Sequence, residues 1–223
     1  MNLNFELINA DPILDQIGNT PLITHPSNDR IFAKNERQNP TLSHKDRLGV
    51  GMILGLLEMG ELSKGQRVVE ASSGNTAGGV ALAANRLNHP CTIVMKSSTS
   101  LIKQGFVKSL GADIISVPDV DHDDSRYYQN VAKNYAKEHN AVYVNQYERP
   151  LNRLVHFSWT GPELYEQIQG KNVTHIIGAV STCGLMSGIG EYIKSKDSSI
   201  QIIGVDGIES NIHRTFHSKG LGD

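Results

Sequence analysis

Residues 67–87 read RVVEASSGNTAGGVALAANRL, and this stretch decides the fold class. Residues 67–71 form a short, mainly apolar run that predicts a buried strand. Residues 76–87 are rich in alanine, the strongest helix former, and predict a helix. The residues between them are small and hydroxyl-bearing, which is typical of a turn. The stretch therefore predicts a strand, a loop and a helix, the first parts of a βαβ unit.

The same alternation of strand and helix signals continues along the chain. Further strands are predicted at 91–95, 112–117, 141–145, 174–180 and 200–205, and further helices at 101–110, 124–138, 162–168 and 185–194. This pattern predicts an α/β fold with mostly parallel, twisted sheets and helices on both faces. Nearer the start, residues 21–25 and 30–34 flank the turn-rich tetrad Pro26-Ser27-Asn28-Asp29. That arrangement predicts a hairpin, and hence an antiparallel portion of sheet.

Composition excludes several classes of partner. The chain has 223 residues and a formal net charge of -2, which gives no electrostatic reason to bind nucleic acid or an anionic membrane. No apolar run is long enough to span a bilayer, and residues 1–12 lack the basic and apolar regions of a signal peptide. Cys91 and Cys183 do not suggest a disulfide framework. We therefore expect a cytoplasmic location with a reducing environment.

Two loops have the composition of anion-binding sites. Each follows a predicted strand and opens a helix, so free backbone N–H groups and the positive end of the helix dipole favour an anion. Ser72-Ser73-Gly74-Asn75-Thr76 suits a carboxylate, and Ser181-Thr182-Cys183-Gly184 suits a phosphate. The alternative is a plain turn in which a Ser, Thr or Asn side chain caps each helix. Gly184-x-x-x-Gly188-x-Gly190 also suggests a nicotinamide cofactor, but these glycines lie inside the predicted helix and the acidic residue expected after it is absent.

A third feature is the lysine in Asn39-Pro40-Thr41-Leu42-Ser43-His44-Lys45-Asp46-Arg47. Lys45 falls in the first turn of a predicted helix, where the helix dipole repels a cation, lowers the lysine pKa and favours a nucleophilic amine. The alternative is an ordinary solvated lysine. The acidic stretch DVDHDD at 119–124 is interpreted as a solvated loop that starts a helix, with cation binding as its alternative. No metal site is predicted.

Seven segments together resemble the cysteine synthase and cystathionine β-synthase family of fold type II pyridoxal phosphate (PLP) enzymes. They occur in the order and spacing of that family and cover nearly the whole chain. They are Ile17-Gly18-Asn19-Thr20-Pro21-Leu22, Lys34-Asn35-Glu36, Asn39-Pro40-x-x-Ser43-x-Lys45-Asp46-Arg47, Ser73-Gly74-Asn75-Thr76, Asn145-Gln146, Thr160-Gly161-Pro162-Glu163 and Gly188-x-Gly190. The resemblance implies a fold like that of the tryptophan synthase β chain, with PLP as cofactor.

The resemblance also implies a role for each matching residue. Lys45 matches the lysine that carries PLP as a Schiff base, and Asn75 matches the asparagine that hydrogen-bonds the ring hydroxyl. The groups that hold the substrate carboxylate match Ser72, Ser73, Gly74, Thr76 and Gln146. The loop that cradles the PLP phosphate matches Ser181, Thr182, Cys183, Gly184 and Leu185. A small mobile domain at 41–145 is expected to close on a larger domain made of 1–40 and 146–223.

The chemistry implied is replacement at the β-carbon of a small amino-acid substrate. Lys45 removes the Cα proton, a β-substituent leaves, a nucleophile adds at Cβ, and Lys45 returns the proton. The simplest version makes cysteine from O-acetylserine and sulfide. The alternatives are synthesis of a 2,3-diaminopropionate precursor from phosphoserine and an amine donor, cystathionine synthesis, and dehydration of serine or threonine. A catalytically inactive remnant or a binding module is the alternative from another class.

The chain departs from the family pattern in several places. The usual phosphate loop Gly-Thr-Gly-Gly-Thr is replaced by residues 181–185, a version that resembles the diaminopropionate branch and favours an acceptor other than sulfide. Ala77 replaces a usual glycine, and His44, interpreted as a packed or solvated side chain, replaces an apolar residue. The large domain is expected to be incomplete at Asp223. The part beyond it usually partners the pyridine nitrogen and forms much of a homodimer interface.

Overall fold

The computed structural model describes residues 6–207, and it confirms the α/β class. The chain divides into two compact units, one ending at Leu151 and the other starting at Asn152. Residues 1–5 and 208–223 lie outside the described part, and so do the predictions that fall on them, which concern the start of the segment compared with a signal peptide and the end of the predicted large domain. The grouping of 1–40 with 146–223 stays a prediction. Within 6–207, no helix is long and apolar enough to cross a membrane.

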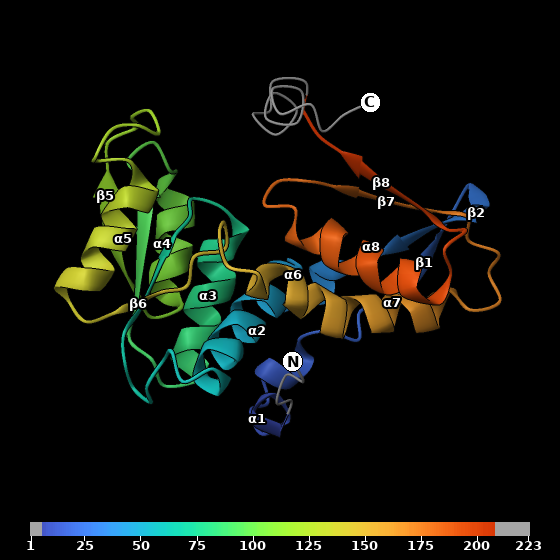
Figure 1. Cartoon of the computed structure of the whole chain (residues 1–223), viewed down its shortest axis with the longest axis horizontal. Coiled ribbons are helices and arrows are strands. Elements are labelled where there is room, and N and C mark those ends of the chain that lie inside the picture. The colour runs from blue at the N-terminus through green and yellow to red at the C-terminus, as the bar shows by residue number, and fades with distance from the viewer. Residues whose placement is uncertain (1–5, 208–223) are drawn as a thin grey trace. The chain divides into compact units, whose positions relative to one another are not determined.

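A four-stranded parallel sheet forms the centre of the first unit, with the strand order β5-β4-β3-β6 (Figure 1). The strands are β3 (Val68–Ala71), β4 (Cys91–Lys96), β5 (Ala112–Val117) and β6 (Val142–Tyr143). Each lies within a residue or two of its prediction, except that β6 is shorter. The Val144 N–H still donates to the Val69 carbonyl oxygen of β3 at 2.9 Å, and the chain then turns away at Asn145, whose φ is 54°.

Helices cover both faces of this sheet, as the alternating pattern predicts. They are α3 (Asn75–Arg86), α4 (Leu101–Ser109) and α5 (Tyr128–Glu138). The chain passes from β3 through α3 to β4 and through α4 to β5, and α5 then returns it to β6 on the other side of β3. Val69 and Ala71 of β3 pack with Ala132 and Ala136 of α5 in one buried cluster. The strand order therefore reverses between β3 and β6, which makes this the topological switch point of the sheet.

Helix α2 (Lys45–Glu58) packs against α3 at a contact that requires glycine on both helices. A Cβ atom on Gly49 would lie 2.2 Å from the Gly79 carbonyl oxygen, and one on Gly79 would lie 2.2 Å from the Lys45 carbonyl oxygen. The two backbones are thus in direct contact. This contact sets the position of the first turn of α2, where Lys45 lies, relative to the first turns of α3.

The predicted hairpin is confirmed, as strands β1 (Leu22–His25) and β2 (Asn28–Lys34) pair antiparallel. Pro26 and Ser27 make the turn, so β2 starts earlier than predicted. Within 6–207 the hairpin forms a two-stranded sheet of its own and does not join the parallel sheet. The short helices of this unit are α1 (Glu6–Asn9), η1 (Leu14–Gln16) and η2 (Glu36–Gln38).

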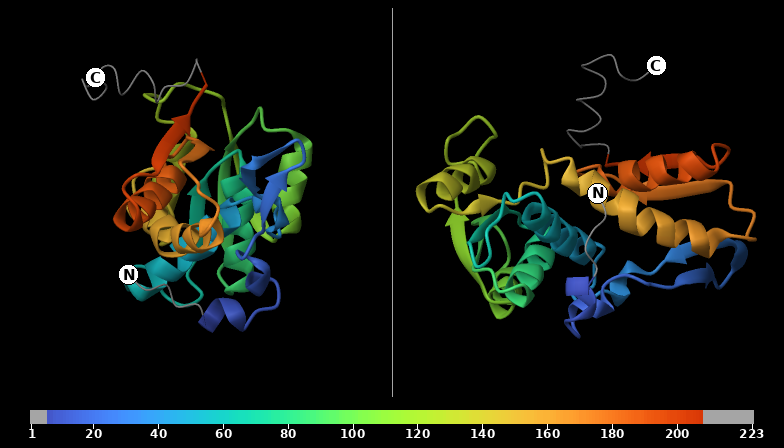
Figure 2. Two further views of the ribbon diagram at one scale, coloured as in Figure 1. Left: turned by 90° about the vertical axis from the view of Figure 1, so that its right-hand side faces the viewer. Right: turned by 60° about the horizontal axis from the view of Figure 1, so that its bottom comes forward.

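The second unit contains a short parallel sheet and two helical stretches. Its elements are α6 (Leu151–Val155, whose first residue closes the first unit), η3 (His156–Thr160), α7 (Gly161–Ile168), β7 (His175–Ala179), α8 (Gly184–Lys196) and β8 (Gln201–Val205). β7 pairs parallel with β8, and α8 connects them. The successive helices η3 and α7 run alongside α8 (Figure 2). Gly188 makes this possible, because a Cβ there would lie 2.4 Å from the Arg153 carbonyl oxygen.

Candidate active site

Helix α2 starts at Lys45, so the prediction that this lysine occupies the first turn of a helix is confirmed. Hydrogen bonds within the preceding segment fix this start. The Asp46 carboxylate accepts hydrogen bonds from the Thr41 N–H, at 2.6 Å, and from the Thr41 hydroxyl, and the Ser43 hydroxyl accepts one from the Lys45 N–H at 3.2 Å. Burial raises the pKa of Asp46, and the hydrogen bonds from Thr41 oppose that change. An acidic residue here also suits the positive end of the helix dipole.

A buried ion pair ties the next residue, Arg47, to the segment before α2. The fully buried Arg47 guanidinium donates to Glu36 Oε2 at 2.8 Å and to Glu36 Oε1 at 2.9 Å. The Thr20 hydroxyl and the Asn39 side-chain amide donate to the same carboxylate at 2.6 and 2.9 Å. These bonds keep the pKa of Glu36 below its ordinary value although burial acts to raise it. These residues belong to the family motifs, but the motifs alone did not predict this anchoring role.

Replacing Arg47 with methionine is expected to lower the free energy of unfolding by about 2 kcal/mol, because Glu36 would keep a half-buried charge without its partner. The matched control is Arg126→Met, which removes an exposed pair with Asp124 and should change the free energy of unfolding far less. Urea denaturation of both variants measures the difference. Equal losses in the two variants would contradict the anchoring role.

The Lys45 side chain is largely buried, and its pKa is lowered to about 8. Burial causes this change, and the nearby Glu70 carboxyl acts in the opposite direction. A lowered pKa was predicted for Lys45, but from repulsion by the helix dipole and not from desolvation. Within 6–207 the Lys45 amine has no hydrogen bond or ion pair, so a neutral amine is available near neutral pH. Burial also lowers the pKa of the neighbouring His44 to about 4, with a further contribution from the Lys45 charge.

The loop between β3 and α3 presents backbone N–H groups rather than a capped turn. Gly74 is the N-cap residue of α3, and no side chain caps the helix, so the N–H groups of Asn75 and Thr76 can donate to a ligand. The Ser72 hydroxyl accepts a hydrogen bond from the Gly74 N–H at 3.2 Å, and the Ser73 hydroxyl accepts one from the Lys96 N–H at 3.1 Å. These hydroxyls shape the loop and tie it to β4. The capped-turn alternative is therefore wrong for this loop.

A hydrogen bond across the switch point connects two residues predicted to hold the substrate carboxylate. Thr76 Oγ1, in the first turn of α3, donates to Gln146 Oε1 at 2.7 Å. Both residues are almost completely buried. Gln146 follows β6, and Thr76 follows β3, so the two adjacent strands deliver them to one edge of the sheet. Ligands of open α/β sheets bind at this edge, where the strand order reverses.

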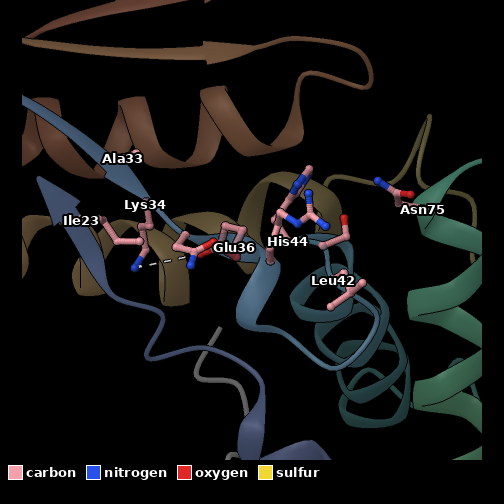
Figure 3. Close-up of a pocket in the computed structure, with 10 residues that line it drawn as sticks. Ile23, Ala33, Lys34, Glu36, Leu42, His44 and Asn75 are labelled. Atoms are coloured by element: carbon pink, nitrogen blue, oxygen red, sulfur yellow. Dashed lines mark ion pairs between the residues drawn. The ribbon is translucent and has the colours of Figure 1, made fainter. Parts of the chain in front are cut away.

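The start of α2 and the start of α3 meet at an open cavity of about 480 Å³ (Figure 3). Its lining includes Ser43 and His44, the residues just before Lys45, and Asn75, the first residue of α3. Asn75 projects from α3 toward the side where His44 and Leu42 lie. The other lining residues come from the hairpin and the segment after it, and they are Ile23, Ala33, Lys34, Asn35, Glu36, Arg37 and Leu42. The predicted partner of the PLP ring and the segment that carries Lys45 therefore share one cavity.

The second predicted anion loop lies in the second unit, between β7 and α8. Cys183 is the N-cap residue of α8, with a φ of 62°, and no side chain caps this helix either. A residue with positive φ before a helix turns successive N–H groups toward one point, which forms an anion-binding concavity. The Thr182 hydroxyl accepts a hydrogen bond from Asn152 Nδ2 at 2.9 Å, which leaves its own proton for a ligand. The capped-turn alternative is wrong here too.

Close packing and hydrogen bonds limit what the rest of this loop contributes. A Cβ on Gly184 would lie 1.9 Å from Asn152 Oδ1, so glycine is required there. The Ser187 hydroxyl donates to the Cys183 carbonyl oxygen at 2.8 Å, so its proton is not free for a phosphate. Gly188 lies inside α8 and serves helix packing, which gives the nicotinamide interpretation no support. Sequence reasoning missed Asn152, since no local pattern shows its contact with a loop 30 residues later.

The acidic stretch at 119–124 and the two cysteines were considered as further sites of binding or chemistry. Asp119 pairs with Lys96 at 2.7 Å, and Asp124 pairs with Arg126 at 2.6 Å, so two acidic residues of the stretch at 119–124 already have cationic partners. Within residues 6–207 no three His, Cys, Asp or Glu side chains gather in a metal-binding group. Both cysteines are free thiols, with Cys91 buried in β4.

Comparison with known proteins assigns the family. Residues 13–221 match the family described as pyridoxal-phosphate dependent enzyme. The chain belongs to this family. This membership confirms the resemblance seen in the sequence motifs. PLP is the cofactor of this family.

Curated relatives of this PLP family member are cysteine synthases and cystathionine β-synthases. A cysteine synthase of Aquifex aeolicus (strain VF5) is 31% identical over 205 residues, which cover 87% of this chain and 62% of that protein. A cysteine synthase of Buchnera aphidicola subsp. Schizaphis graminum (strain Sg) is 34% identical, covering 91% and 64%. A cystathionine β-synthase of Apis mellifera is 36% identical, covering 87% and 40%. The chain thus spans less than two thirds of the length of these relatives.

Solved structures show the same fold. O-acetyl serine sulfhydrylase isoform 3 from Entamoeba histolytica has a TM-score of 0.79 and 31% identity, covering 91% of this chain and 62% of that one. O-ureido-L-serine synthase has a TM-score of 0.84 at 24% identity, covering 91% and 65%. The fold type II architecture predicted from the sequence is therefore confirmed.

The residues of this chain fit PLP when each unit is taken separately. The first unit offers a buried amine with a lowered pKa at Lys45, which suits the cofactor aldehyde, and the exposed amide of Asn75. The second unit offers uncapped N–H groups at the start of α8 and the Thr182 hydroxyl, which suit a phosphate. The individual roles assigned to Lys45, Asn75, Gln146 and the two loops stay predictions.

Proposed function

We propose that this chain carries out PLP-dependent β-replacement on a small amino acid, most simply the formation of cysteine from O-acetylserine and sulfide. The observation that supports this most is the buried Lys45 amine at the start of α2, beside the uncapped start of α3. PLP supplies the delocalised ring that withdraws electrons from the substrate Cα. The cysteine synthases among the relatives support the same reaction class.

Different residues of the first unit bind the substrate carboxylate and transfer the Cα proton. The N–H groups of Asn75 and Thr76 at the start of α3 bind the substrate carboxylate, and the Thr76–Gln146 hydrogen bond keeps the loop at 72–76 in place. Fixing the carboxylate orients the Cα–H bond toward its base. Lys45 takes that proton and returns it after the nucleophile has added at Cβ. A pKa of about 8 suits both transfers near neutral pH.

Attachment of the cofactor tests the proposal directly. Incubation of the full chain with PLP should produce a visible absorbance band, and borohydride reduction followed by peptide mapping should place the pyridoxyl group on Lys45. Turnover of O-acetylserine with sulfide should follow. A protein that stays colourless at saturating PLP would contradict the proposal and favour an inactive remnant or a binding module.

One observation favours an alternative reaction in which the second substrate is an amino acid and not sulfide. The cavity beside His44 has a volume of about 480 Å³ and includes Arg37, whose guanidinium would attract the carboxylate of a larger acceptor. Cystathionine β-synthases are among the relatives, with 36% identity for the one from Apis mellifera. Competition between sulfide, homocysteine and glutamate, with O-acetylserine, serine and phosphoserine as donors, would separate cysteine, cystathionine and diaminopropionate-precursor synthesis.

The assembly and the location of the protein are also proposals. We propose that the active form is a homodimer, which light scattering would test, and that the protein acts in the cytoplasm. The proposed small domain at 41–145 contains the whole four-stranded sheet.

A further inference from the structure

Asn152 places a buried amide side chain beside the predicted phosphate loop. It lies in α6, is the first residue of the second unit, and is only 3% exposed. The loop between β7 and α8 belongs to the same unit. Burial of an amide costs free energy unless its polar atoms have partners. Its contacts with the loop therefore indicate what this residue does that an apolar residue could not.

The amide of Asn152 contacts the loop at two points. Its Nδ2 atom donates to Thr182 Oγ1 at 2.9 Å. The rest of the amide fills the space next to Gly184, because a Cβ on that glycine would lie 1.9 Å from Asn152 Oδ1 and 2.2 Å from its Cγ. The contact with the Gly184 backbone limits rotation of the amide and keeps its nitrogen on Thr182.

Thr182 differs in its hydrogen bonding from the other hydroxyl-bearing residues at the start of α8. The Ser187 hydroxyl gives its proton to the Cys183 carbonyl oxygen at 2.8 Å, and Ser181 is exposed. The Thr182 oxygen accepts a hydrogen bond from a buried donor, and no acceptor within residues 6–207 takes its proton. A hydroxyl carries one proton and two lone pairs. Because Asn152 occupies a lone pair, Thr182 is held as a donor toward a ligand.

We propose that Asn152 is a positioning residue for the cofactor phosphate, because it holds the Thr182 hydroxyl with its proton directed at that phosphate. This inference rests on the proposed function, in which the loop binds PLP, and adds the residue that orients the side-chain donor of the loop. The uncapped N–H groups at the start of α8 supply the other donors. A phosphate dianion only accepts hydrogen bonds, so a hydroxyl already held as a donor binds it without a further cost of ordering.

Pyridoxamine 5′-phosphate is the probe for this inference, since it carries the phosphate but has no aldehyde and cannot attach to Lys45. Isothermal titration calorimetry of the full chain gives its dissociation constant, and pyridoxamine, which lacks the phosphate, is the matched ligand. Asn152→Ala and Thr182→Val should each raise the dissociation constant of the phosphate ligand roughly tenfold, because a hydrogen bond to a charged group is weakened or lost. Thr182→Ser keeps the hydroxyl and should stay within about threefold of the wild type. None of these variants should change the affinity for pyridoxamine.

A double-mutant cycle separates positioning from packing. If Asn152 acts through the Thr182 hydroxyl, the double variant Asn152→Ala with Thr182→Val should bind the phosphate ligand no more weakly than Thr182→Val alone. Asn152→Asp keeps the shape but turns the donor into a charged acceptor, which takes the Thr182 proton and repels the phosphate, so it should weaken binding more than Asn152→Ala does. Ser187→Ala is the matched control, because the Ser187 proton is already bound to the Cys183 carbonyl oxygen, and it should leave the affinity unchanged.

Several results would overturn the positioning role of Asn152. They are additive losses in the cycle, an equal loss of affinity for pyridoxamine, wild-type affinity in Asn152→Asp, and no binding of pyridoxamine 5′-phosphate to the wild type. Circular dichroism verifies folding of each variant. Thr182→Val changes only a half-buried side chain, so an unchanged affinity there overturns the inference even if no Asn152 variant folds.

The outcomes also separate this inference from the proposed function. A protein that stays colourless with PLP would contradict the proposed function, but binding of pyridoxamine 5′-phosphate would still test Asn152, because it does not use Lys45. Conversely, a failed cycle would leave attachment of PLP to Lys45 unaffected.

Discussion

Lys45→Ala is expected to lower the rate of β-replacement at least about a thousandfold, since the same amine anchors the cofactor and transfers the Cα proton. The variant should also fail to retain a visible band after gel filtration. Removing the largely buried Lys45 side chain, which has no hydrogen bond within residues 6–207, should change stability little. Steady-state rates and spectra, with circular dichroism to verify folding, measure the effect.

The matched control for this prediction is Lys133→Ala on α5. Lys133 is an exposed lysine on the face of α5 away from the buried Ala132 and Ala136. Its removal should leave both rate and spectrum unchanged. A folded Lys45→Ala variant that keeps more than about one tenth of the wild-type rate would show that another group is the base.

Much of the fold was predictable from local pattern. The composition of residues 67–87 predicts a strand, a turn and a helix. The structure places β3 and α3 within one residue of that prediction. The stretch at 151–160 was not predicted, and it forms α6 and the π-helical turn η3. Gly161-Pro162 follows it and normally ends a helix, since proline cannot bond to the carbonyl four residues earlier. The wider π-helical turn accommodates this missing backbone hydrogen bond. Helix α8 packs against the turn through Gly188.

The candidate site was predictable in its parts but not in its energetics. Lys45 and the loop at 72–76 were found because lysine at a helix start and small residues after a strand are local signals. The cause of the lowered Lys45 pKa could not be predicted locally, because desolvation depends on how α2 and α3 pack. No role was predicted for Glu70, although a charged residue within an apolar strand is itself unusual and therefore informative. Which strand neighbours β3, and hence the meeting of Thr76 with Gln146, needs the sheet order.

Gly79→Ala is expected to lower the free energy of unfolding by at least about 3 kcal/mol, although the same change in most helices is stabilising. Alanine is favoured over glycine in a helix interior by up to about 1 kcal/mol. At Gly79 the new Cβ would lie 2.2 Å from the Lys45 carbonyl oxygen and 2.6 Å from its carbon. Backbone atoms cannot rotate away as a side chain does, so α2 and α3 must separate and the cost exceeds the gain.

The matched control is Gly105→Ala on α4, where a Cβ would have no neighbour within 4 Å. That variant should be stabilised by up to about 1 kcal/mol, so the two glycine-to-alanine changes have opposite signs. Urea denaturation of both gives the comparison. Since the clash at Gly79 is with Lys45 itself, any folded Gly79→Ala protein should also bind PLP more weakly, whereas Gly105→Ala should bind it normally. A stabilised Gly79→Ala variant would mean that α2 and α3 are not in backbone contact, and the geometry proposed for Lys45 would then lose its support.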